Sequence, residues 1–284
     1  IVCTLNPYFY PTLAEVEAFE QFPEAVPLNG PVAVKGWSHD VIAESKDMSS
    51  SVNGTLDDQG WVLYSTSVAK TGAVAGDDRI VKTSAGTEFK LADYTQNNAL
   101  VLKTADESKD LVFDEPANCE ELYFLMISAN GRSEVETVAN YEDGTQSEPS
   151  EFRPEDWYSM FSSGDEAVYG ISRIITKNAD NYIAGDIDTR YSFRLYEFTM
   201  PTDKSKRIKS VTFTSKKSSS YPTILGIAKK GYYVPTGIVS VDTEEGAGEI
   251  QGIYNINGMR LNAPQRGINI IRYKNGSTKK VIIR

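Results

Sequence analysis

From residue 31 onward, the chain consists of short apolar or alternating runs separated by glycine, asparagine, aspartate, serine and proline. Runs of this length are typical of strands joined by tight turns. Isoleucine and valine together outnumber leucine by 42 to 14, and β-branched side chains suit pleated strands better than helices. We therefore predict an all-β protein, an antiparallel jelly-roll-like β-sandwich followed by a small C-terminal β-hairpin or sandwich domain.

Twelve runs are predicted to be strands of the sandwich. They are residues 31–35, 41–44, 61–65, 88–92, 99–103, 111–113, 122–129, 134–142, 168–176, 190–200, 207–214 and 223–229. The run 122–129 is apolar on both of its faces, which predicts a central strand covered on two sides. The run 134–142 alternates, which predicts one wet face, and Asp143-Gly144 after it favours a hairpin turn.

Three parts of the chain are expected. Residues 1–30 form an N-terminal extension whose segment 12–21 reads as a short helix, with Thr12 and Glu15 in the positions of a capping box. Residues 31–235 form the sandwich. Residues 236–284 form the small C-terminal domain, in which Asn257-Gly258 and Asn275-Gly276 each follow an apolar run and predict two hairpins.

The formal net charge is −10, which argues against a general nucleic-acid or anionic-membrane binder because like charges repel. The charge is uneven, near −20 over residues 1–200 and near +10 over residues 201–284. The basic stretch 204–217 is either a site for an anionic ligand or a set of lysines that discourages pairing at a sheet edge. The two opposite charges could also help the C-terminal part to dock onto the sandwich.

An ordered series of segments resembles the galactose-binding-like β-sandwich modules of secreted bacterial glycosidases and related proteins. It covers roughly residues 31–230 and comprises Trp37–Ala43, Glu88–Leu91, Asn98–Leu102, Leu122–Gly131, Val138–Thr145, Asp156-Trp157, Arg194–Glu197 and Lys206–Phe213. The resemblance implies a jelly-roll-like fold, carbohydrate binding and, in many such modules, a structural calcium ion. In that family the Asp-Trp turn closes the sandwich, which favours burial of Trp157.

The C-terminal stretch is similar to the sorting domain that directs proteins through the type IX secretion pathway to the cell surface. The similarity rests on the hairpin Gly252–Leu261, the strand-like run Arg266–Gly276 and the terminal Lys279–Arg284. Residues 237–284 are shorter than is usual for that family. The similarity implies a secreted or cell-surface protein exported from a Gram-negative bacterium.

The predicted carbohydrate site lies around the polar loop 53–60. Pyranose rings stack on flat aromatic faces while carboxylates and amides bond their hydroxyls, and this loop leads directly into two aromatic residues. The predicted binding residues are Trp61, Tyr64, Asn53, Asp57 and Asp58. Trp61 and Tyr64 fall on opposite faces of a straight strand, so only one of them is expected to face outward.

No catalytic residue is predicted. His39 is the one histidine of the chain, too few for a hydrolytic triad or a multi-histidine metal site, and a structural role is favoured. Carboxylates alone can hydrolyse glycosides, but adjacent acids in a strand point to opposite faces. Calcium could use Asp57 and Asp58, or Asp186 and Asp188, although neither pair has the spacing of a calcium loop; the metal ligands are left unknown and no other cofactor is expected.

The favoured function is therefore a secreted, non-catalytic carbohydrate-binding protein of the bacterial cell surface. Two alternatives remain, a structural or adhesion module that recognises protein and a carboxylate-based glycoside hydrolase. The expected partner is an oligo- or polysaccharide, with no nucleic acid, no transmembrane segment and a monomer by default. Cys3 and Cys119 could form one disulfide or remain free.

Overall fold

The computed structural model describes residues 29–158, 166–178, 181–182, 186–231, 249–274, 276 and 278–283. The chain forms two compact units, residues 1–232 and 233–284, and each is described by itself. The predicted helix over 12–21 and Cys3 lie outside the described residues. Within them, no helix is long and apolar enough to cross a membrane.

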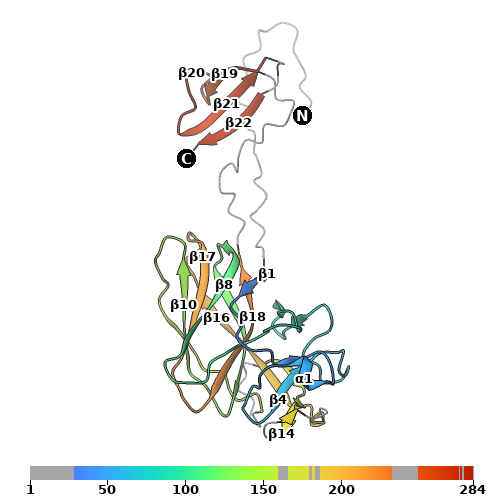
Figure 1. The fold of residues 1–284 in the computed structure, drawn as a ribbon. Coiled ribbons are helices and arrows are strands. Elements are labelled where there is room, and N and C mark those ends of the chain that lie inside the picture. The colour runs from blue at the N-terminus through green and yellow to red at the C-terminus, as the bar shows by residue number, and fades with distance from the viewer. Residues whose placement is uncertain are drawn as a thin grey trace. The chain divides into compact units, whose positions relative to one another are not determined.

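Two antiparallel sheets build the first unit (Figure 1). The six-stranded sheet has the order β1-β18-β9-β16-β12, with β7 also paired to β18. Its strands are β1 (Gly30–Pro31), β7 (Leu100–Val101), β9 (Glu121–Ala129), β12 (Glu166–Ile171), β16 (Phe193–Pro201) and β18 (Tyr221–Lys230). The five-stranded sheet has the order β11-β10-β17-β8-β2. Its strands are β2 (Val34–Lys35), β8 (Ser108–Ala117), β10 (Val135–Tyr141), β11 (Ser150–Phe152) and β17 (Ile208–Ser215).

The chain passes back and forth between these two sheets from β7 to β18, which confirms the predicted all-β, jelly-roll-like sandwich. The strand β10 alternates buried and partly exposed residues, as expected for one wet face. Its turn is the predicted hairpin, since Gly144 has a φ of 85° and its amide bonds the carbonyl of Tyr141 at 3.1 Å. All twelve predicted strands have a counterpart among the observed elements.

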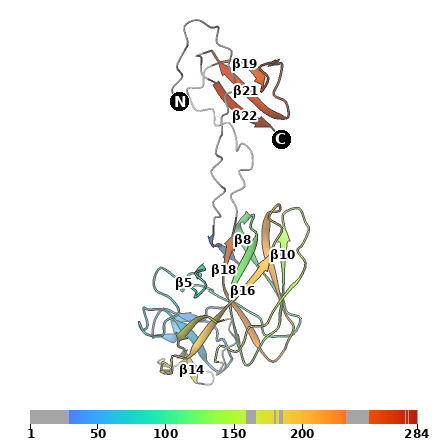
Figure 2. The same ribbon diagram turned by 180° about the vertical axis from the view of Figure 1, so that it is seen from behind.

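A third layer covers part of the outer face of the six-stranded sheet. Figures 1 and 2 show this blue and cyan part of the chain beside the sandwich, on the side away from β10. It contains a three-stranded sheet of order β13-β4-β3, in which β3 and β4 are parallel, and two further pairs of strands. The elements are β3 (Ile42–Ala43), α1 (Met48–Ser51), β4 (Trp61–Tyr64), β5 (Ile80–Lys82), β6 (Glu88–Lys90), β13 (Ile174–Ile175), β14 (Lys177–Asn178) and β15 (Asn181–Tyr182).

The strand β9 belongs to two hydrophobic cores. Leu122, Phe124 and Met126 pack between the two main sheets, whereas Leu125 and Ile127 pack under the third layer. All five side chains are fully buried. This arrangement explains the doubly apolar pattern of residues 122–129 and confirms the predicted central strand.

The second unit contains one four-stranded antiparallel sheet of order β20-β19-β21-β22. Its strands are β19 (Ile250–Asn255), β20 (Arg260–Leu261), β21 (Gly267–Tyr273) and β22 (Thr278–Ile283). Both predicted hairpins are present, with a φ of 76° at Gly258 and 88° at Gly276, a backbone conformation that glycine adopts without strain. Ile271, Tyr273 and Val281 form a small buried cluster on one face.

The basic stretch 204–217 lies on and beside β17, which is an inner strand between β10 and β8. The suggestion that its lysines protect a sheet edge is therefore wrong. Five of its six cations pair instead with acids of neighbouring segments. The pairs are Lys204–Glu120, Lys206–Asp143, Arg207–Glu142, Lys216–Glu136 and Lys217–Glu134, with nitrogen to oxygen distances of 3.0–3.2 Å.

The charge division also changes when it is counted by structural unit. Residues 1–232 contain 22 lysines and arginines against 35 acids, and residues 233–284 contain 7 against 4. The first unit is thus near −13 and the second near +3. Most of the positive charge after residue 200 belongs to the sandwich and neutralises its own acids.

Candidate functional site

An open cleft of about 730 Å³ lies along one side of the first unit. One wall is the segment 31–37, which contains β1 and β2, and the other is formed by Arg79, the end of β6 and the following residues 91–97. Asp114 of β8 completes the lining. The volume falls in the range of small-molecule binding sites, roughly 300–1,000 Å³.

Trp37 is the aromatic residue of this cleft. Its side chain is partly buried against the core between the two main sheets, and the backbone after it is fixed because the amides of Ser38 and His39 both bond the carbonyl of Ala99. Gly36 precedes it with a φ of 112°, and a Cβ atom there would lie 2.5 Å from the carbonyl oxygen of Asp110. Only glycine lets the wall pass this close to β8.

Polar side chains line the same cleft as Trp37. The Asn97 amide donates to the carbonyl of Trp37 at 3.3 Å, and Arg79 forms an ion pair with Asp93 at 3.2 Å. Hydrogen bonds from Thr95 keep the pKa of the Asp93 carboxyl below its usual value, so this acid is ionised at neutral pH. The cleft thus combines one aromatic face with amide, carboxylate and cationic groups, a composition suited to a polyhydroxylated ligand.

Two polar residues support the cleft from behind. Asn53 accepts from the amide of Asp40 at 2.8 Å and donates to Asn97 Oδ1 at 2.8 Å. The carboxyl of Asp40 accepts from Asn98 Nδ2 at 2.5 Å, and burial raises its pKa to about 7. Asn53, one of the predicted binding residues, therefore contacts a residue that lines the cleft.

The other predicted binding residues lie elsewhere. Tyr64 is fully buried and its hydroxyl donates to the carbonyl of Thr71 at 2.8 Å, so its ring cannot form a sugar platform and that expectation is corrected. Asp58 is exposed and forms an ion pair with Lys103. Because the chain turns through Asp58 with a φ of 57°, its carboxylate and that of Asp57 point to different partners.

Asp57 and Trp61 belong to a cluster around Arg173, which we call the arginine cluster. The Arg173 guanidinium lies 4.0 Å from the ring centre of Trp61, 3.1 Å from Asp188 Oδ2 and 3.7 Å from Asp57 Oδ2. Asp57 is 4% exposed and also accepts from the amides of Gln59 and Trp61. Burial raises the pKa of Asp57, whereas hydrogen bonds from Arg190 hold that of Asp188 at about 2.

These contacts do not fit a calcium site. Asp57 and Asp188 are both directed at the guanidinium of Arg173, and Asp188 also pairs with Arg190. A cation among them would compete with two arginines. Across the residues that the structure describes, no group of three or more histidine, cysteine or acidic side chains could hold a metal ion.

In each of the following pairs of adjacent acids, the two carboxylates bond different groups. Asp57 and Asp58 bond Arg173 and Lys103, respectively, and Asp77 and Asp78 bond Ser67 and the Ile80 amide. Glu120 and Glu121 bond Lys204 and Lys230, and Glu142 and Asp143 bond Arg207 and Lys206. Glu155 and Asp156 bond Arg132 and the Gly131 amide. The two carboxylates of a glycosidase face one scissile bond, whereas the two members of each of these pairs are held by different groups.

Three further side chains from the sequence analysis, His39, Trp157 and Cys119, are held within the fold. His39 bonds Ser38 through Nδ1 at 2.8 Å, and burial, with smaller contributions from Lys103 and Lys109, lowers its pKa. Trp157 is 2% exposed, as the Asp-Trp turn predicts, and its amide bonds the carbonyl of Ser128. Cys119 is buried, and burial raises the pKa of its thiol.

No protein-family model matches this chain, and no similar sequence is found among curated proteins. Among solved structures, the K3 adhesin domain of Lys-gingipain from Porphyromonas gingivalis has 10% identity over 51% of this chain and 79% of its own, with a TM-score of 0.25. A family 28 carbohydrate-binding module specific for non-crystalline cellulose has 11% identity over 63% and 90%, with a TM-score of 0.25. A family 11 module of a Clostridium thermocellum cellulase has 12% identity over 50% and 81%, with a TM-score of 0.24.

Proposed function

We propose that the first unit is a non-catalytic carbohydrate-binding module and that its ligand lies in the Trp37 cleft. The observation that carries this proposal is the open cleft of about 730 Å³ with one partly buried indole among amide and charged side chains. An indole offers a flat apolar face, and fixed polar groups around it provide orientation and specificity. The ordered resemblance to galactose-binding-like modules points to the same ligand class.

The test is binding of the intact chain to a broad plant and host glycan panel, followed by calorimetry on the best ligand. Trp37→Ala should weaken binding at least about tenfold, since aromatic anchors dominate binding energy. The matched control is Tyr169→Ala, because Tyr169 is 64% exposed and lies outside the cleft. Absence of any binding, or equal losses in the two variants, would reject the proposal.

A protein-binding adhesion module is the main alternative, and it would require an exposed apolar patch. In the described part of the first unit, the exposed large apolar side chains are Val112 and Tyr169. They lie on strands of different sheets, β8 and β12. For the first unit, the described surface therefore favours the carbohydrate proposal over the adhesion alternative.

We further propose that the protein acts outside the cell and that residues 233–284 serve as an export domain of the type IX kind. The two-hairpin sheet of β19 to β22 and the sequence resemblance support this proposal. Expression of residues 1–284 and 1–232 in a type IX-competent bacterium and in its secretion-deficient mutant tests it. The full chain should reach the surface only in the competent strain; periplasmic retention of both forms in both strains would contradict it.

A further inference from the structure

The charged side chains of the Trp37 cleft are not balanced by one another. The lining contains Lys35, Arg79 and Lys90 against Asp93 and Asp114. Arg79 and Asp93 form an ion pair at 3.2 Å. In the described part of the chain, neither Lys35 nor Lys90 has an acidic partner within ion-pair distance, so one cation on each wall remains available to a ligand.

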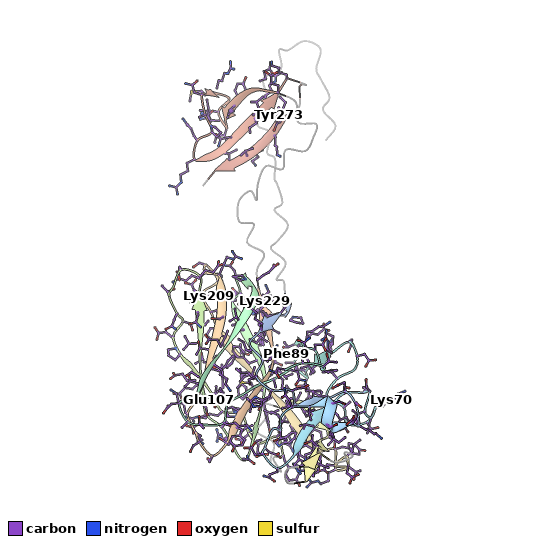
Figure 3. All side chains as sticks on the ribbon, viewed as in Figure 1. Lys70, Phe89, Glu107, Lys209, Lys229 and Tyr273 are labelled. Atoms are coloured by element: carbon purple, nitrogen blue, oxygen red, sulfur yellow. The ribbon has the colours of Figure 1, made fainter. Side chains whose placement is uncertain are left out.

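The local backbone explains why both lysines stay exposed. In β6, Phe89 is fully buried in the core under the third layer (Figure 3), so its strand neighbours Glu88 and Lys90 point the other way. In β2, Val34 packs against the core between the main sheets and Lys35 is exposed. Two different strands, each held by an apolar neighbour, thus present a lysine to the same cleft.

Most other cations of the first unit have acidic partners, unlike Lys35 and Lys90. The described arginines and most of the described lysines pair with acids on neighbouring segments, as along β17. At physiological salt, charges more than about 8 Å away are largely screened, so the nearby groups rather than the net −13 of the unit determine the potential inside the cleft. Those nearby groups are three cations and two anions.

We infer that the cleft selects an acidic saccharide, one whose sugar units carry carboxylate or sulfate groups. Trp37 would stack against the apolar face of a ring, while Lys35 and Lys90 from the two walls would contact its anionic substituents. An ammonium group acts as a point charge and does not distinguish carboxylate from sulfate. This inference rests on the proposed carbohydrate function and narrows its substrate class.

The experiment compares calorimetric affinities of the intact chain for four oligosaccharides of similar length. They are oligogalacturonate, its methyl ester, a κ-carrageenan fragment, which carries sulfate but no carboxylate, and a neutral cello-oligosaccharide. At least one of the two acidic ligands should bind at least about tenfold tighter than the methyl ester and the neutral ligand. The carboxylate and sulfate arms then identify which anionic group the cleft takes.

The double variant Lys35→Gln/Lys90→Gln should lose most of this preference, so that its affinity for the acidic ligands falls to that for the methyl ester. The control is Lys70→Gln, because Lys70 is exposed at the outer edge of the unit and outside the cleft (Figure 3). Equal affinity for acidic and neutral ligands, with both lost in Trp37→Ala, would overturn this inference and leave the carbohydrate function standing. No binding of any saccharide would reject both.

Discussion

The Trp37 cleft and the arginine cluster each contain a partly exposed tryptophan next to polar loops, yet their chemistry differs. In the cleft the indole lines an open space of about 730 Å³ beside Lys35 and Lys90, which form no ion pair with any acid that the structure describes. In the arginine cluster the face of Trp61 lies against the Arg173 guanidinium, whose charge is balanced by Asp57 and Asp188. The guanidinium covers the face of Trp61 that it contacts, so that face cannot stack on a sugar ring.

Removal of Arg173 should give the largest effect. Arg173→Ala leaves Asp57 and Asp188 without their shared partner, and loss of one member of a buried ion pair costs about 3–5 kcal/mol. Urea denaturation should show a loss of about 3 kcal/mol with the affinity for glycans unchanged. The control Arg190→Ala, whose side chain is 49% exposed, should cost less than about 1 kcal/mol. Equal losses in both variants would contradict the role given to Arg173.

Trp61→Ala should have the opposite effect to Trp37→Ala, with a loss of stability but little loss of glycan affinity. Because its ring packs against the third-layer core and Arg173, we expect a stability loss of about 2–3 kcal/mol, at the lower end for an aromatic truncated at a partly exposed site. Binding to the best glycan should change by less than about twofold. Thermal denaturation and calorimetry on the same preparation separate the two effects. If the variant folds normally but loses glycan binding, Trp61 belongs to the binding site.

The carboxyl of Asp40, next to Asn53 and Asn98, should make the stability of the first unit depend on pH. Its pKa is about 7 in the folded chain and 3.8 in the reference state, so between these values the folded chain holds a proton that the unfolded chain has released. Stability therefore falls as the pH rises from about 4 to 7. Asp40→Asn should be more stable than the wild type by about 1–2 kcal/mol at pH 8, within the ~1.4 kcal/mol per pKa unit that linkage allows.

Urea denaturation of both proteins at pH 4 and pH 8 measures this difference. The advantage of Asp40→Asn should shrink at pH 4, where Asp40 is largely protonated in the folded chain. The affinity of the cleft for a neutral saccharide should not depend on this substitution. An advantage that is the same at both pH values would show that the carboxyl does not titrate as described.

Asn53→Ala should have the smallest effect. It removes the hydrogen bond that positions Asn97 and the one that accepts from the Asp40 amide, and each such bond contributes about 1 kcal/mol. We expect saccharide affinity to fall about two- to fivefold and stability to fall by about 1 kcal/mol. Calorimetry distinguishes this from the larger loss in Trp37→Ala. An unchanged saccharide affinity would show that the hydrogen bond from Asn53 is not needed to position Asn97 for binding.

The strands were predictable because strand periodicity is local, and the buried strand 122–129 even revealed its two covered faces. The binding site was not predictable in the same way. Trp37 and Lys90 lie more than 50 residues apart in sequence, and only the tertiary fold brings them to the same cleft. Trp61 and Asp57 follow a polar loop and resemble a binding site locally, but their partner Arg173 comes from a distant segment. The arrangement of charged partners depends on tertiary structure, which one sequence does not display.

The position of β9 between two cores has a consequence for cooperativity. Each of its faces belongs to a different hydrophobic cluster. If one cluster unfolds, β9 loses the packing on one face, and the other cluster is destabilised as well. Regions that share such a central element unfold together. The third layer and the sandwich should therefore behave as one folding unit, with a shared denaturation midpoint, and the amides of β9 should be among the slowest to exchange with solvent.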